Sequence, residues 1–278
     1  MTGIIDVGGG TRGIYGCGVF DRCLDENISF DYVIGVSAGS ANAISYVSGQ
    51  RGRNYVFYTE YAMRPEYMGL KTLLKTGSYI GLEYIYGTLT NSGGEYPLDY
   101  DTLKSSPAEL EIVATDAETG KPFYFCKKTL RRDRYQCLMA SSCVPVACRP
   151  YPVNGVLYYD GGISDPIPYR RSLQLGCDKL VVILTKPVTA EPGNRRNALA
   201  GRLIRRKYPE AARAVARCNS VYQRDLKAVI NLEKEGKALI IAPDDISNLK
   251  TLSSDLTALK RLYDKGYNDA SSIVSFLK

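Results

Sequence analysis

Short apolar runs alternate with longer amphipathic segments along most of this chain. Runs rich in β-branched residues predict strands, and apolar residues three or four positions apart predict helices. The expected strands are residues 3–7, 31–34, 111–115, 123–126, 156–159, 179–184 and 238–241. The expected helices are 14–26, 38–48 and 169–175, with two more near the C-terminus. The first of these two has Leu252, Leu256, Leu259 and Tyr263 on one face and is capped by Gly266, and the second is short and reaches Leu277. This alternation predicts an α/β fold, a three-layer α/β/α sandwich with a mostly parallel central sheet.

Two segments depart from this alternation. Residues 51–107 are rich in tyrosine and glycine, and we expect irregular helices and loops inserted between the second and third strands. Residues 194–217 contain eight basic residues and one acid, Glu210, so they carry the whole net charge of +7. The remainder of the chain is therefore electrically balanced, and the excess charge belongs to one region.

The bulk composition limits the classes of protein. Of 278 residues, 45% are hydrophobic and 23% are charged, which is ordinary for a globular protein with a sizeable core. There is neither an apolar run long enough for a membrane span nor a signal-peptide pattern at the N-terminus, so we expect a cytoplasmic protein. The eight cysteines include no C-x-x-C pair and the chain has no histidine, so we expect free thiols and no metal site.

A candidate nucleophile follows the second expected strand, in Gly35-Val36-Ser37-Ala38-Gly39. An apolar strand leads into this G-x-S-x-G motif, and small residues open a helix after it. This is the strand, elbow and helix that a nucleophilic serine requires, with glycines two positions away on each side because side chains there would clash. A tight βα turn built from small residues would show the same pattern.

A glycine-rich turn, Gly8-Gly9-Gly10-Thr11-Arg12-Gly13, follows the first expected strand. Such a turn before a helix exposes backbone N–H groups and can hold a phosphate or an oxyanion. Gly8, Gly10 and Gly13 match G-x-G-x-x-G, but no acid ends the next strand and no Gly-Lys-Ser/Thr follows. A nucleotide-binding enzyme is therefore disfavoured, and an oxyanion hole fits better beside a nucleophile. Arg12 would brace the turn, supply charge near the oxyanion, or form a surface salt bridge.

A candidate proton acceptor ends the strand 156–159, in Asp160-Gly161-Gly162. A common Asp-Gly turn would have the same sequence. Because the chain contains no histidine, a Ser-His-Asp triad is impossible. If Ser37 is a nucleophile, a carboxylate is the simplest group to take its proton.

These three motifs, in this order, resemble the patatin-like phospholipases, a family that uses a Ser–Asp dyad without a catalytic histidine. The resemblance covers residues 3–187, and it also includes the segments 113–122, 140–145 and 165–168. It implies Ser37 as the nucleophile and Asp160 as the proton acceptor of an enzyme that cleaves lipid esters, of phospholipase A or lysophospholipase type. It implies an oxyanion hole in the glycine-rich turn, chiefly Gly9 and Gly10, and no cofactor.

The resemblance also suggests a division of the chain. We expect a patatin-like catalytic core over residues 1–187, including the insertion 51–107, and a basic helical region over 188–278 that packs on the core. An acyltransferase using the same serine and a non-catalytic anion-binding protein of the same fold are the alternatives.

The basic cluster Arg195–Arg217 suggests peripheral contact with an anionic membrane, and we expect no nucleic acid partner. On a helical projection, Arg196 and Lys207 fall near Leu199 and Leu203, which disfavours a clean amphipathic helix. A solvated basic face or a mobile lid is the alternative.

Overall fold

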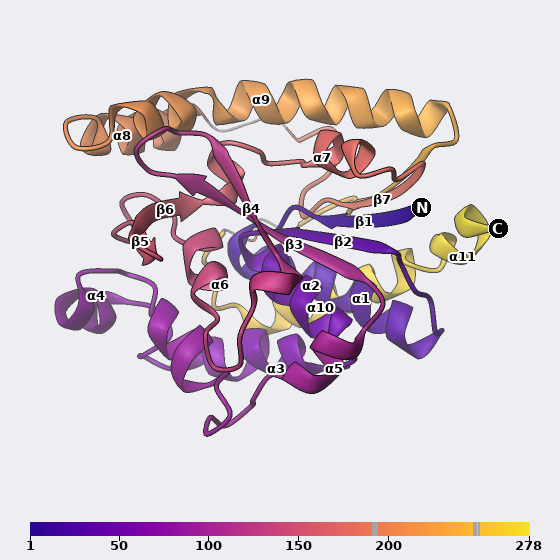
Figure 1. Ribbon diagram of the computed structural model, residues 1–278, viewed down its shortest axis with the longest axis horizontal. Coiled ribbons are helices and arrows are strands. Elements are labelled where there is room, and N and C mark those ends of the chain that lie inside the picture. The colour runs from indigo at the N-terminus through magenta and orange to yellow at the C-terminus, as the bar shows by residue number, and fades with distance from the viewer. Residues whose placement is uncertain (191–193, 247–248, 250) are drawn as a thin grey trace.

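A computed structural model describes residues 1–190, 194–246, 249 and 251–278, and it leaves the side chains of 194–196 outside that description. An eight-stranded sheet with helices on both faces forms its centre, as the sequence pattern predicts (Figure 1). The strands are β1 (Thr2–Asp6), β2 (Tyr32–Val36), β3 (Glu109–Asp116), β4 (Pro122–Cys126), β5 (Tyr151–Val153), β6 (Val156–Asp160), β7 (Lys179–Ile183) and β8 (Ala238–Ile241). The helices are α1 (Ile14–Asp25), α2 (Ala38–Val47), α3 (Arg53–Thr59), α4 (Leu70–Thr76), α5 (Tyr100–Ser105), α6 (Gln136–Ser141), α7 (Tyr169–Gln174), α8 (Asn194–Ile204), α9 (Pro209–Lys234), α10 (Leu256–Asp269) and α11 (Ser272–Leu277).

The sheet has the order β5-β6-β3-β2-β1-β7-β8, and β4 pairs with β3. The five strands β3, β2, β1, β7 and β8 are mutually parallel, whereas β4, β5 and β6 pair in antiparallel fashion. The parallel strands are almost fully buried on both faces, which explains why they appear in the sequence as continuous apolar runs.

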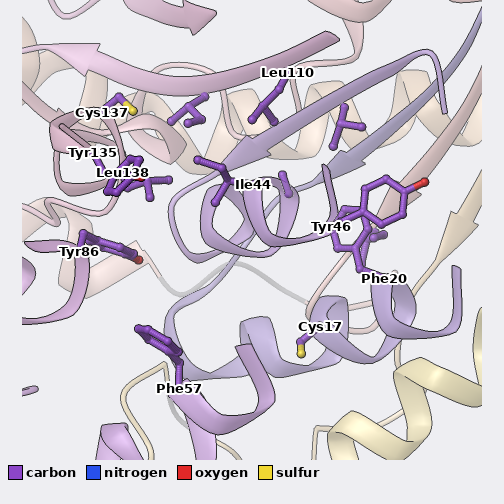
Figure 2. Close-up of a cluster of buried hydrophobic side chains, with 14 of the residues drawn as sticks. Cys17, Phe20, Ile44, Tyr46, Phe57, Tyr86, Leu110, Tyr135, Cys137 and Leu138 are labelled. Atoms are coloured by element: carbon purple, nitrogen blue, oxygen red, sulfur yellow. The ribbon is translucent and has the colours of Figure 1, made fainter. Parts of the chain in front are cut away.

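Alternate side chains of each strand enter two separate cores. Ile5 and Ile34 face α7 and α9, where they pack with Leu226 and Val229 of α9. The opposite face of the sheet packs on α1, α2 and α10 (Figure 1). Figure 2 shows part of that second core, including the rings of Phe20 on α1 and Tyr46 on α2, whose centroids lie 4.9 Å apart.

Helix α10, which precedes the C-terminal helix α11, packs tightly across α1, and this contact corrects one expectation. Gly266 lies inside α10 and does not cap it, because the helix continues to Asp269. A Cβ on Gly266 would lie 2.1 Å from the Tyr15 carbonyl oxygen, and one on Gly18 would lie 2.2 Å from the Tyr263 carbonyl oxygen. The glycines therefore allow the two helix backbones to approach closely.

The polar segment before β8 forms the 26-residue helix α9, which the apolar pattern did not predict. The segment 51–107 forms α3, α4, α5 and shorter turns between α2 and β3. No helix in the described part of the chain combines the length and apolar character that a membrane span requires.

Candidate active site

The turn between β2 and α2 places Ser37 in a left-handed backbone conformation, with φ 56° and ψ −128°. A non-glycine residue rarely adopts this conformation, and such strain is concentrated at functional sites. A Cβ on Gly35 would lie 2.4 Å from Ser40 Cα, and one on Gly39 would lie 2.3 Å from the Asp6 carbonyl oxygen. Both glycines of the motif are thus required by close packing, as the spacing predicted.

The pairing of β3 explains how Asp160 comes to lie beside Ser37. Val36, at the end of β2, pairs with Val113 of β3, and Asp160, at the end of β6, pairs with the next residue, Ala114. Since β4 occupies the other edge of β3 at these positions, β2 and β6 meet end to end along one edge. The carboxylate of Asp160 accepts a hydrogen bond from the Gly162 N–H at 2.8 Å, and it lies close enough to the Ser37 side chain for that group to lower its pKa.

Burial controls the electrostatics of this pair. The exposed fractions of Ser37 and Asp160 are 9% and 7%. Burial raises the pKa of Asp160 to about 6, and the Ser37 side chain and the Gly162 N–H oppose this rise only in part. The carboxyl group is therefore ionised at neutral pH and remains more basic than an exposed aspartate.

The last residue of α6 and the loop after it hold the backbones of both residues. Ser141 Oγ accepts a hydrogen bond from the Ser37 N–H at 2.9 Å, and the Cys143 carbonyl accepts one from the Asp160 N–H at 2.9 Å. Thr115 Oγ1 donates to the Asp160 carbonyl at 2.8 Å. The loop belongs to the segment 140–145 that the resemblance included, but the sequence does not show which of its atoms support the pair.

The glycine-rich turn lies against the elbow. Gly8, Gly9 and Gly10 have φ values of 66°, 134° and 62°, which favour glycine. A Cβ on Gly8 would lie 2.2 Å from the Val36 carbonyl oxygen, so the turn packs directly on the residue before Ser37. In the described part of the chain, the N–H groups of Gly9 and Gly10 donate no hydrogen bond, and both residues line the same cavity as Ser37.

Asp6, which the sequence analysis did not single out, anchors this turn. Its carboxylate accepts hydrogen bonds from the Gly8 N–H and from Asn42 Nδ2, both at 2.8 Å. Asn42 Nδ2 also donates to the Gly13 carbonyl at 2.8 Å. Burial raises the pKa of Asp6 to about 6. Gly13 lies at the junction of the turn with α2 and is closely packed, because a Cβ on it would lie 2.4 Å from the Tyr58 hydroxyl oxygen.

The segment before α10 braces the turn from outside. Arg12 is buried, forms no ion pair with the described acids, and donates to Thr251 Oγ1 at 3.2 Å. The Thr11 N–H donates to the Thr251 carbonyl at 2.8 Å, and the Ser253 N–H donates to Thr11 Oγ1 at 3.0 Å. The interpretation of Arg12 as a surface salt bridge is therefore wrong, and its contacts fit a brace. The C-terminal region therefore supports the turn.

A cavity of about 840 Å³ opens above Ser37 and Asp160. Gly9, Gly10 and Gly162 also line it. Most of its wall is apolar or aromatic and includes Phe57, Tyr58, Leu82, Ile85, Tyr86 and Val215. A cavity of this size and character can enclose a small, mostly apolar ligand.

Comparisons with known proteins agree with this architecture. A family model described as "Patatin-like phospholipase" matches residues 7–171, and a second, described as "Domain of unknown function (DUF6363)", matches residues 208–277. The "Uncharacterized protein YjjU" of Escherichia coli (strain K12) is 29% identical in an alignment of 195 residues that covers 65% of this chain and 50% of that protein. The chain thus spans about half the length of this curated relative.

Among solved structures, VipD from Legionella pneumophila superposes with a TM-score of 0.49 and 14% identity, over 99% of this chain and 66% of that chain. The family match extends over more than half of the residues, from the residue after β1 into α7, and contains all three motifs. The chain belongs to the patatin-like phospholipase family.

Proposed function

We propose that this protein is a serine acyl hydrolase that cleaves carboxylic ester bonds of lipids, with Ser37 as nucleophile and Asp160 as proton acceptor. The main support is one observation: the side chain of the strained elbow serine lies against a buried carboxylate in a chain that has no histidine. A binding protein would not require this contact or this backbone strain.

The proposed reaction has two steps. Ionised Asp160 accepts the proton of the Ser37 hydroxyl as its oxygen attacks the ester carbonyl, and the resulting oxyanion accepts hydrogen bonds from the Gly9 and Gly10 N–H groups. The alcohol or lysolipid leaves with the proton from Asp160, and an acyl-serine remains. Asp160 then removes a proton from water, which attacks the acyl-serine, and returns that proton to the Ser37 oxygen as the acyl bond breaks, which releases the fatty acid and free Ser37.

The proposed substrate class follows from the shape of the site. The apolar walls of the cavity would hold the acyl chain, so that the ester carbonyl lies at Ser37. The N-terminus of α2, which begins at Ala38, directs its dipole at the developing negative charge. Phospholipase A or lysophospholipase activity fits this arrangement.

Covalent labelling tests the proposal directly. We expect a fluorophosphonate probe to modify the intact chain at Ser37, as identified by peptide mass spectrometry, and labelling to be abolished in Ser37→Ala. A short-chain nitrophenyl ester should be hydrolysed by the same preparation. An unlabelled Ser37 in a folded protein would contradict the assignment and favour a non-catalytic anion-binding protein.

The pH dependence of hydrolysis should report the ionisation of Asp160. Its pKa is raised to about 6, so the carboxylate is available above that pH and protonated below it. We therefore expect kcat/KM for a neutral ester to be level above about pH 7 and to fall at least tenfold per pH unit well below 6. Asp6 titrates in the same range and would steepen this decline. Undiminished hydrolysis at pH 4.5 (about 1.5 pH units below that pKa) would argue against Asp160 as the base.

A further inference from the structure

Exposed leucines and a valine lie on two helices and a loop that each contribute residues to the cavity wall. On α4, Leu70 and Leu74 are 72% and 88% exposed, and on α8, Leu199 and Leu203 are 60% and 62% exposed. Val146, in the loop after α6, is 55% exposed. Large apolar side chains that cluster with such exposure mark an interaction surface.

These side chains frame the opening of the candidate active site. Leu199, Leu203 and Val146 line the same cavity as Ser37 and are nevertheless well exposed, so the cavity reaches solvent between them. Leu73 on α4 also lines the cavity. Figure 1 shows α4 and α8 at the same end of the molecule, on either side of β5 and β6. We call this region, formed by α4, α8 and the loop at Val146, the cavity rim.

Unpaired positive charge accompanies the apolar side chains of the cavity rim. Arg202, Arg205, Arg206 and Lys207 are exposed, and none of them forms an ion pair with an acid in the described residues. Nearby acids are already paired, as Glu210 is with Arg213. On α4, Lys71 contacts Glu66 at 3.7 Å and Lys75 has no described partner. The cavity rim is therefore apolar with a cationic margin.

The structure also corrects the helical projection of this segment. Helix α8 ends at Ile204, so Lys207 is not on it, and the side chain of Arg196 lies outside the described residues. Within α8, Leu199 and Leu203 are four positions apart and share one face. Both leucines line the cavity, and Arg202 does not.

We propose that the cavity rim docks on the surface of an anionic lipid bilayer. This inference rests on the proposed function, because a lipid hydrolase gains from opening its cavity directly to the membrane. The leucines of α4 and α8 would enter the boundary between head groups and acyl chains, and the cations would contact anionic head groups. A lipid chain could then enter the cavity without crossing water.

The test measures binding of the full chain to vesicles of phosphatidylcholine with and without phosphatidylglycerol. We expect binding to the anionic vesicles only, and a strong decrease as salt rises from about 0.1 M to 1 M. We expect the partition coefficient to fall at least tenfold in each of two variants. Leu70→Glu/Leu74→Glu removes the apolar contact with the bilayer. Arg205→Glu/Arg206→Glu removes two surface cations, and one such cation alone contributes about fivefold. Matched controls are Leu175→Glu on the loop after α7 and Lys227→Glu/Lys234→Glu on α9, which should bind as the wild type does.

A soluble short-chain ester separates this proposal from the proposed function. The leucine and arginine variants should hydrolyse that ester at the wild-type rate, because none of the four residues lines the cavity. If the wild type fails to hydrolyse any ester, the proposed function fails whatever the vesicles show. Equal binding to neutral and anionic vesicles, or undiminished binding by both variants, would overturn the docking surface. A third result would also overturn the docking surface: tight binding to soluble polyglutamate, combined with vesicle binding that Leu70→Glu/Leu74→Glu does not weaken. That result would indicate an acidic polypeptide as the partner.

Discussion

Replacement of Ser37 with alanine, or of Asp160 with asparagine, is expected to lower ester hydrolysis by about 10⁴-fold or more. Ser37→Ala removes the atom that would form the acyl-enzyme. Asp160→Asn leaves an amide that can accept the Gly162 N–H bond but cannot take the serine proton. Single-turnover rates with a nitrophenyl ester measure the effect, and labelling by a fluorophosphonate should be lost in the first variant and greatly slowed in the second.

Stability measurements show whether the variants remain folded. Because burial raises the pKa of Asp160 from 3.8 to about 6, the folded protein binds this proton more tightly than the unfolded chain. The stability that protonation contributes is lost as pH rises through about 6, so at pH 8 the buried charge is unfavourable by up to about 3 kcal/mol. We therefore expect Asp160→Asn to unfold at an equal or higher temperature than the wild type at pH 8.

Two substitutions elsewhere serve as matched controls. Ser172→Ala removes a buried hydroxyl of α7, and Asp165→Asn removes a carboxyl group that accepts the Tyr124 hydroxyl at 2.6 Å. Neither residue lines the cavity, so both variants should keep near wild-type activity. Appreciable turnover by Ser37→Ala, or a folded Asp160→Asn enzyme with normal kcat, would refute the dyad.

The second large effect is expected at the glycine-rich turn. Gly9 has φ 134° and ψ 37°, a conformation that an L-residue adopts only with strain, and a Cβ there would lie 2.4 Å from Thr185 Oγ1. Gly9→Ala should therefore displace the proposed oxyanion donors. We expect kcat to fall by about 10²–10³-fold, the loss typical of a removed oxyanion-hole donor, with KM less affected.

Gly155, at the turn between β5 and β6, offers the matched control. Its φ is 84°, and a Cβ there would have no neighbour within 4 Å. Gly155→Ala should cost about 1–2 kcal/mol of folding stability through backbone strain alone and leave kcat unchanged. If Gly9→Ala lowers stability in the same way but leaves kcat intact, the turn does not hold the oxyanion.

Most of the strands could be predicted because they lie inside the sheet. Strands β1, β2 and β7 are buried on both faces and therefore appear as apolar runs. Strand β5 has only three residues, contains Pro152 and is not fully buried, so it has no such pattern. Helix α9 covers one face of the sheet and is otherwise polar and basic. Its apolar positions are interspersed with charged residues, which made its apolar stripe hard to recognise in the sequence. The family resemblance is confirmed by the match over residues 7–171.

The residues that support the site could not be identified from local patterns. Ser141 contacts Ser37 across 104 positions of the chain, and Thr251 contacts Thr11 across 240. Serines and threonines are common, and only the packed chain shows which of them reach the motif backbones. Asp6 is similar, because its role depends on Asn42 of α2 lying beside it.

The sequence by itself determined the three motifs, the glycines that their turns require, and the absence of any imidazole to serve Ser37. Those properties depend on backbone torsions and close contacts of neighbouring residues, so a short stretch of sequence contains them. Only the tertiary structure decided that Asp160 meets Ser37 along one edge of β3, that burial raises its pKa, and that apolar side chains of α4 and α8 surround the cavity. Strand register and burial arise from residues far apart in the chain, and no local pattern specifies them.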